Sequence, residues 1–215
     1  MIHEALRLFG NRRSANTYKV ELLLSQLGLE FEYVDIDLGP NSKSQTPEYR
    51  RINPLGQIPS LGISDERYIT QSAAILCYLA QGSRFLPSSA YDQALVMQWL
   101  FFEQYEIEPN VGWARWICHI AKSADRMTSE LGRYRDRGGR ALAILDEKLA
   151  CSSFVAGDQY SIADAALYAY THLASEGGFA LGHLQNVCGW LRRIEGLPGY
   201  LPMSGDMTRP CTHQP

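Results

Sequence analysis

The first 81 residues alternate between short strand patterns and helical patterns, and this alternation limits the possible folds more than any other feature of the chain. Residues 6–9 form an apolar stretch that ends at Gly10-Asn11, which is typical of a strand and its exit turn. From Ser14 onward, apolar residues recur at helical spacing until Gly28, a residue type that commonly ends helices. The segment 31–36 predicts a second strand, because it is rich in aromatic and β-branched residues.

The next segments continue the alternation. Thr46-Pro47 predicts the start of a helix, since proline is favoured at the first helical position. Two short strands, 58–61 and 68–70, surround a polar turn at 64–66 and predict a hairpin, after which Ser72 begins another helix. The expected order is therefore strand, helix, strand, helix, strand, strand, helix, which indicates an α/β domain over residues 1–81.

Beyond residue 81 only helical patterns follow. Residues 82–89 have the composition of a linker, and 90–215 are expected to form an all-α domain. Pro109 lies inside the first long helical pattern and is expected to kink or break it, because proline removes a backbone donor. The tail after Pro198 is rich in proline and glycine and is expected to coil over the surface.

Charge and motif content exclude several classes of protein. The chain has 20 Lys and Arg against 23 Asp and Glu, a net charge of −3, which gives no electrostatic reason to expect a nucleic-acid or membrane partner. It has no apolar run of transmembrane length and no secretion-signal pattern, so a cytoplasmic protein is expected. Its five cysteines are scattered and its five histidines lack metal-ligand spacing, so we expect reduced thiols and no metal site.

Three motifs, in order along the chain, resemble those of the cytosolic glutathione S-transferase family. Residues 53–59 resemble the family's loop before its cis-proline, and 70–75 resemble its (Glu/Gln)-Ser-x-Ala-Ile helix start. Residues 157–164 resemble a buried element of its second domain. The resemblance implies a thioredoxin-like first domain, an all-α second domain and glutathione as co-substrate. The segments 101–105 and 168–172 are most similar to a bacterial subgroup.

The resemblance also implies where glutathione binds. A cis Ile58-Pro59 bond would turn the backbone of Ile58 outward to pair with the cysteinyl part of glutathione, beside Gln57. Without the resemblance, the same residues are read as the start of a strand with an edge proline. Gln71 and Ser72 would hold the γ-glutamyl carboxylate at a helix N-terminus, although Ser72 can also be read as a plain N-cap.

Glutathione chemistry requires a thiolate. A thiol with a pKa of about 8.5 is only about 3% ionised at pH 7, and lowering this pKa by two units takes about 2.7 kcal/mol. One hydrogen bond to the sulfur together with a helix N-terminus supplies that much. Family members with a catalytic tyrosine carry it where this chain has Phe9, and no cysteine precedes Cys77. Ser14 matches the serine of the Ser-type classes, and Asn16 matches an asparagine of bacterial disulfide-bond reductase relatives, so the resemblance implies that Ser14 and Asn16 are the donors. The alternative is that Ser14 only caps its helix.

The second domain contributes the remaining predictions. The resemblance implies that this domain forms the pocket for the second substrate, and the candidates are Tyr105, Trp113, Arg115, Trp116 and His119. Side chains of these types at helical spacing are also typical of a helical core, and an arginine among aromatic rings calls for a partner. Ser161 and Asp164 are assigned to folding, as a capping box at the start of a helix.

Taken together, the residues and the resemblance predict a glutathione transferase that conjugates glutathione to a small hydrophobic electrophile. Two alternatives stay open. A glutathione-dependent disulfide reductase or peroxidase would use the same site, and Asn16 favours it. A non-catalytic interaction or regulatory protein of the same fold is disfavoured by the intact motifs at 57–59 and 71–72. The resemblance further implies a homodimer.

Overall fold

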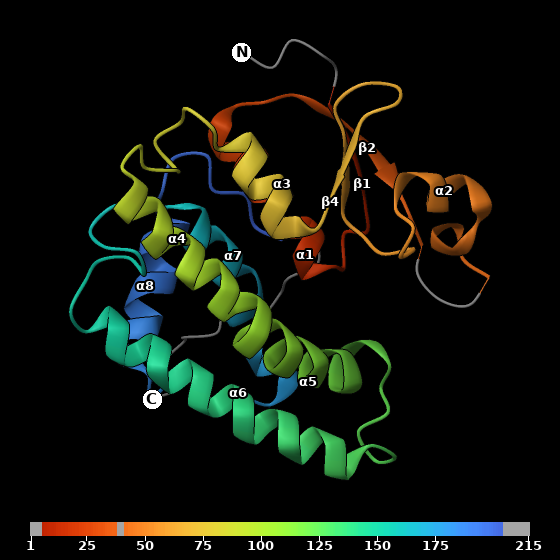
Figure 1. The fold of residues 1–215 in the computed structure, drawn as a ribbon. Helices are drawn as coiled ribbons and strands as arrows, with labels where there is room; N and C mark the ends of the chain where they lie inside the picture. The colour runs from red at the N-terminus through yellow and green to blue at the C-terminus, as the bar shows by residue number, and fades with distance from the viewer. Residues whose placement is uncertain (1–5, 38–40, 204–215) are drawn as a thin grey trace. The chain divides into compact units, whose positions relative to one another are not determined.

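The computed structural model describes residues 6–37 and 41–203 (Figure 1). Of these, 6–37, 41–81 and 198–203 form one compact unit, and 82–197 form a second. Residues 198–203 follow the helical segments in sequence, yet they belong to the first unit. The Tyr18 hydroxyl donates a hydrogen bond to the Leu201 carbonyl at 2.6 Å, which ties this stretch to the first helix.

The first unit contains a mixed four-stranded sheet in the order β2-β1-β3-β4. Strands β1 and β2 are parallel, whereas β3 is antiparallel to both β1 and β4. The predicted order of elements is confirmed, with these bounds: β1 Leu6–Gly10, α1 Ala15–Leu27, β2 Phe31–Asp35, η1 Lys43–Gln45, α2 Pro47–Ile52, β3 Ser60–Gly62, β4 Tyr68–Thr70 and α3 Ser72–Leu79.

Helix α1 begins and ends where its sequence signals lie. The Ser14 side chain accepts a hydrogen bond from the Thr17 amide at 3.3 Å, and Gly28 ends the helix with a φ of 65°, a left-handed conformation that glycine adopts without strain. Its apolar residues, including Leu22 and Leu23, are fully buried, as is Leu8 of β1. The Asn11 amide, directly after β1, donates a hydrogen bond to the Thr17 hydroxyl at 3.3 Å, which holds the start of α1 beside the end of β1.

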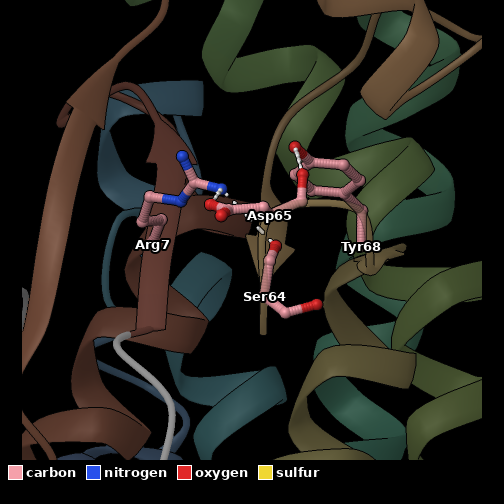
Figure 2. Close-up of polar contacts among 4 residues, drawn as sticks. All are labelled: Arg7, Ser64, Asp65 and Tyr68. Atoms are coloured by element: carbon pink, nitrogen blue, oxygen red, sulfur yellow. Dashed lines mark hydrogen bonds and ion pairs between the residues drawn. The ribbon is translucent and has the colours of Figure 1, made fainter.

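Polar contacts secure the turn between β3 and β4 (Figure 2). The Arg7 guanidinium donates to the Ser64 carbonyl and to the Asp65 carboxylate, both at 3.4 Å. The Tyr68 hydroxyl donates to the Asp65 carbonyl at 2.7 Å. Because the Asp65 side chain is fully exposed, its ion pair with Arg7 adds little stability, and these contacts mainly define the shape of the turn.

The named elements of the second unit are all helices. Its elements are α4 Ala90–Phe102, η2 Glu103–Gly112, α5 Trp113–Arg115, η3 Trp116–Ile120, α6 Thr128–Leu149, α7 Ile162–Thr171, η4 Ala174–Gly177 and α8 Gln185–Glu195. Pro109, which was expected to kink or break its helix, does not break the helical path. It lies within η2, a π-helical stretch whose hydrogen-bonding pattern already differs from that of α4 at Glu103.

Ser161 and Asp164 form a capping box at the start of α7. The Asp164 carboxylate accepts hydrogen bonds from the Ser161 amide at 3.0 Å, the Val155 amide at 2.9 Å and the Trp190 indole at 3.0 Å. Burial raises the pKa of Asp164 to about 6, against the opposing effect of these donors. One carboxylate therefore joins three separate segments of the helical unit.

Two further findings concern the described residues as a set. Over 6–37 and 41–203, no helix is both long enough and apolar enough to span a bilayer. Cys77, Cys118 and Cys151 carry free thiols, but Cys188 is disulfide-bonded, so the expectation that all the cysteines are reduced is wrong at that position.

Candidate functional site

Ser14 and Asn16 lie at the N-terminal end of α1, and both are partly exposed. The Ser14 oxygen accepts the capping hydrogen bond from Thr17, so its hydroxyl proton can still be donated to another group. The free N–H groups of the first helical turn lie at the same place, where the helix dipole favours negative charge. The N-terminal end of α1 is therefore suited to binding an anion.

Asn16 connects this helix end to the start of α3. The Ser72 hydroxyl donates to the Asn16 Oδ1 atom at 3.2 Å, across 56 residues of sequence. The Lys19 ammonium donates to the same oxygen at 2.8 Å and lies 3.5 Å from the Ser72 Oγ atom. Asn16 was predicted to contact the sulfur of the ligand and Ser72 its carboxylate. Their side chains are in direct contact in the structure.

These contacts determine which way the Asn16 amide faces. An ammonium group can only donate, so the atom facing Lys19 must be the oxygen of Asn16 and not its NH₂ group. The Nδ2 atom, at the other end of the amide, makes no hydrogen bond with any described residue of the chain. Since Asn16 is partly exposed, this NH₂ group is available to donate to a bound molecule.

Gln71 and Ser72 form the junction between β4 and α3. Gln71, and not Ser72, occupies the cap position, so the alternative interpretation of Ser72 as a plain N-cap is wrong. Gln71 is exposed and has a φ of 69°, a region that residues other than glycine rarely adopt and that is found most often at functional sites. Ser72 is the first helical residue, is buried, and directs its hydroxyl to Asn16.

The loop before β3 presents its backbone at the cis Ile58-Pro59 bond, which confirms the cis geometry implied by the resemblance. The carbonyl of Gln57 accepts hydrogen bonds from the Tyr49 hydroxyl and the Asn53 amide, both at 2.8 Å, and these hold the loop in place. The backbone N–H and C=O of Ile58 enter no hydrogen bond within the described part of the chain. They can therefore pair with an extended peptide-like ligand.

The predicted pocket residues of the second unit divide into separate contacts. Arg115 is buried and its Nε donates to Glu176 at 2.5 Å, while the His119 ring lies 3.7 Å from the same carboxylate. Trp113 and Trp116 lie edge to face, with ring centroids 5.4 Å apart and just over two-fifths of each residue exposed. Tyr105 is 72% exposed and takes part in neither contact.

One polar residue at the site was missed by the sequence analysis. Lys19 is fully buried, although lysine almost never is unless it is paired. The helical pattern around it emphasises Val20 and the leucines that follow, and a lysine beside them would ordinarily be placed in solvent. Its only signal is its spacing, three residues after Asn16, which puts the two side chains on one helix face. No three metal-ligating side chains gather anywhere within 6–37 and 41–203.

Two family models match this chain. The family model described as "Glutathione S-transferase, N-terminal domain" matches residues 4–81, and that described as "Glutathione S-transferase, C-terminal domain" matches residues 114–198. Among solved structures, a glutathione S-transferase from Pseudomonas fluorescens Pf-5 is 38% identical with a TM-score of 0.91, and the match covers 94% of this chain and 100% of that one.

Similar proteins differ in the activities that their names state. The disulfide-bond oxidoreductase YfcG of Escherichia coli K12 is 28% identical over 190 residues, which are 85% of this chain and 87% of that protein. Glutathione S-transferase 3 of Zea mays is 30% identical over 171 residues, which are 74% of each chain. This chain is thus similar both to a protein named as a glutathione S-transferase and to one named as a disulfide-bond oxidoreductase.

Proposed function

The chain belongs to the glutathione S-transferase family, and on that premise we propose that it binds glutathione in its first unit, stabilises the thiolate and transfers it to a small hydrophobic electrophile. The observation that carries the proposal is the contact of Ser72 with Asn16 at 3.2 Å. This contact brings the start of α3, proposed to bind the carboxylate, close to the start of α1, proposed to bind the sulfur. One small peptide can therefore reach both.

The two ends of glutathione are assigned to different elements. The γ-glutamyl carboxylate binds at the start of α3, where Gln71 and Ser72 meet the free N–H groups of the first turn. The cysteinyl backbone pairs with Ile58, as an added strand does, beside Gln57 and Pro59. Support for the second assignment comes from the unbonded backbone groups of Ile58.

The thiolate is stabilised at the start of α1. Ser14 donates its hydroxyl proton and Asn16 donates through Nδ2, in a field that already favours negative charge. Each hydrogen bond to a charged sulfur is worth about 1.5–3 kcal/mol, so one of them with the helix end lowers the thiol pKa by one to two units. The sulfur then attacks the electrophile and displaces its leaving group.

The electrophile is held by the second unit. Trp113 and Trp116 offer partly exposed aromatic faces, and the stacked pair of Trp113 with Tyr134, at 6.5 Å between centroids, widens that surface. Arg115 and His119 share Glu176 and can orient a polar substituent. Tyr105 completes the proposed set. We assign the protein to a bacterial subgroup that uses Ser and Asn, and we place it in the cytoplasm as a homodimer with a role in detoxification.

A second activity has its own support. The similarity to a protein named as a disulfide-bond oxidoreductase, over 85% of this chain, favours reduction of disulfides by glutathione at the same site. No cysteine precedes Cys77 in the sequence, and burial raises the pKa of the Cys77 thiol, which disfavours a protein thiol as the attacking group. Such a reaction would therefore use a second glutathione as the attacking thiol.

The two activities are separated by measuring turnover of a chlorinated dinitrobenzene and of a glutathione mixed disulfide with the same preparation. We expect conjugation to be the faster reaction, and we expect Ser14→Ala and Asn16→Ala each to lower it at least about tenfold. Faster disulfide exchange would favour the second activity. Unchanged rates in both variants would contradict the assignment of the thiolate donors.

A further inference from the structure

Lys19 is placed where a cation is costly. It lies in the second turn of α1, near the positive end of the helix dipole, and it is fully buried. Burial disfavours an ammonium group, and so does the neighbouring helix N-terminus. Both costs fall when negative charge or strong acceptors lie close by.

We propose that Lys19 is the positioning residue of the glutathione site, fixing the Asn16 amide and supporting Ser72 so that both can donate to the ligand. This inference rests on the proposed function. The geometry follows from the helix: side chains tilt toward the N-terminus, so Lys19 reaches back one turn to Asn16. There its ammonium donates to the Oδ1 atom at 2.8 Å.

The first consequence concerns Asn16. Since ammonium donates and never accepts, it holds the oxygen inward and turns the Nδ2 group toward the ligand. The charge-assisted hydrogen bond also polarises the amide, which makes Nδ2 a better donor to a thiolate. Without Lys19, the amide can rotate by half a turn about its last bond and present an oxygen to the sulfur, which would repel it.

The second consequence concerns Ser72. Its single hydroxyl proton is donated to Asn16 in the structure, at 3.2 Å, so a carboxylate that binds at α3 must take that proton away from Asn16. Lys19 has three donors and lies within 3.5 Å of the Ser72 Oγ and 2.8 Å of the Asn16 Oδ1. It can satisfy both oxygens when the hydroxyl turns to the ligand, so neither is left as an unpaired buried acceptor.

The test is a double-mutant cycle on the thiol pKa of bound glutathione, read from the ultraviolet absorbance of the thiolate and from the pH profile of kcat/KM. Lys19→Met keeps most of the length of the unbranched side chain and removes its donors. We expect this variant to raise the thiol pKa by about one unit, close to the effect of Asn16→Ala. In the Asn16→Ala background, Lys19→Met should add little further shift, because it acts through Asn16.

Two other variants complete the design. Val20→Ala removes fully buried apolar volume one position away on α1, so it is expected to lower stability and leave the pH profile unchanged. Lys19→Gln keeps an N–H donor on a slightly shorter side chain. If Lys19→Met does not fold, Lys19→Gln replaces it in the double-mutant cycle. It should shift the thiol pKa less than Lys19→Met does.

The inference is overturned if the Lys19 variants bind glutathione with the wild-type thiol pKa, or if their shift is the same with and without Asn16. Failure of the wild-type protein itself to bind glutathione would instead overturn the proposed function. The two failures are therefore distinguishable in one set of titrations.

Discussion

Ser14 has two separable roles at the start of α1. Its oxygen accepts the capping hydrogen bond from Thr17, and we assign its proton to the glutathione sulfur. A single alanine substitution removes both, so it cannot tell a structural serine from a catalytic one. Substitutions that keep the cap and change only the donor make the distinction, because aspartate caps helices about as well as serine.

We expect Ser14→Ala to lower the free energy of unfolding by about 1 kcal/mol, whereas Ser14→Asp should remain within a few tenths of the wild type. Both variants should raise the thiol pKa of bound glutathione, Ser14→Asp the more strongly, because a carboxylate repels the thiolate. Urea unfolding and thiolate absorbance measure the two quantities. An unchanged thiol pKa in Ser14→Asp would show that Ser14 only caps α1 and does not stabilise the thiolate.

Single residues also mark the limit of sequence reasoning at the site. Ser14, Asn16 and Ser72 were predicted because the segments around them, at two helix starts, resemble motifs of a known family. Lys19 was not, because burial of a lysine depends on the packing of α1, which no local pattern reveals. The direct contact of Ser72 with Asn16 was equally out of reach, since it joins residues 56 positions apart.

Among the elements, the start of α7 depends on one carboxylate. Asp164 accepts hydrogen bonds from Ser161, Val155 and Trp190, so it links α7 to a preceding loop and to α8. Burial raises the pKa of Asp164 from 3.8 to about 6. Between these values the folded protein holds a proton that the unfolded chain has lost, so the contribution of Asp164 to stability falls as the pH rises.

A prediction follows for Asp164→Asn, which cannot titrate. The difference in unfolding free energy between wild type and this variant should favour the wild type most at about pH 4. It should decline by up to about 3 kcal/mol as the pH approaches 6 and then stay level. Urea unfolding across pH 4–8 measures the difference. A difference that is constant over this range would show that Asp164 is ionised in the folded protein throughout.

The helices and strands themselves were largely predictable, because each carries a local signal. Gly28 ends α1 and Pro47 begins α2 at the positions that their residue types indicate. Pro109 was the exception: a proline removes one hydrogen bond, but the wider π-helical turns of η2 let the chain continue. That choice depends on what packs around the helix, which is a property of the folded unit.

At the scale of the whole molecule, the alternation of residues 6–79 followed by helices was enough to indicate the class of fold. The chain after Pro198 was assigned to the helical part on sequence position alone. Its return to the first unit, where Leu201 accepts a hydrogen bond from Tyr18, requires a contact that only the folded chain makes. Sequence order and spatial grouping differ here because loops can bring distant segments together at small entropic cost.

We expect this protein to bind glutathione and to make its thiol give up a proton. Titration calorimetry of glutathione, repeated in two buffers of different ionisation enthalpy, measures both parts at once. We expect one glutathione to bind per chain with release of protons near neutral pH, and S-methylglutathione to bind at the same site with no release. Absence of binding heat in folded protein, or binding of glutathione without proton release, would contradict this expectation.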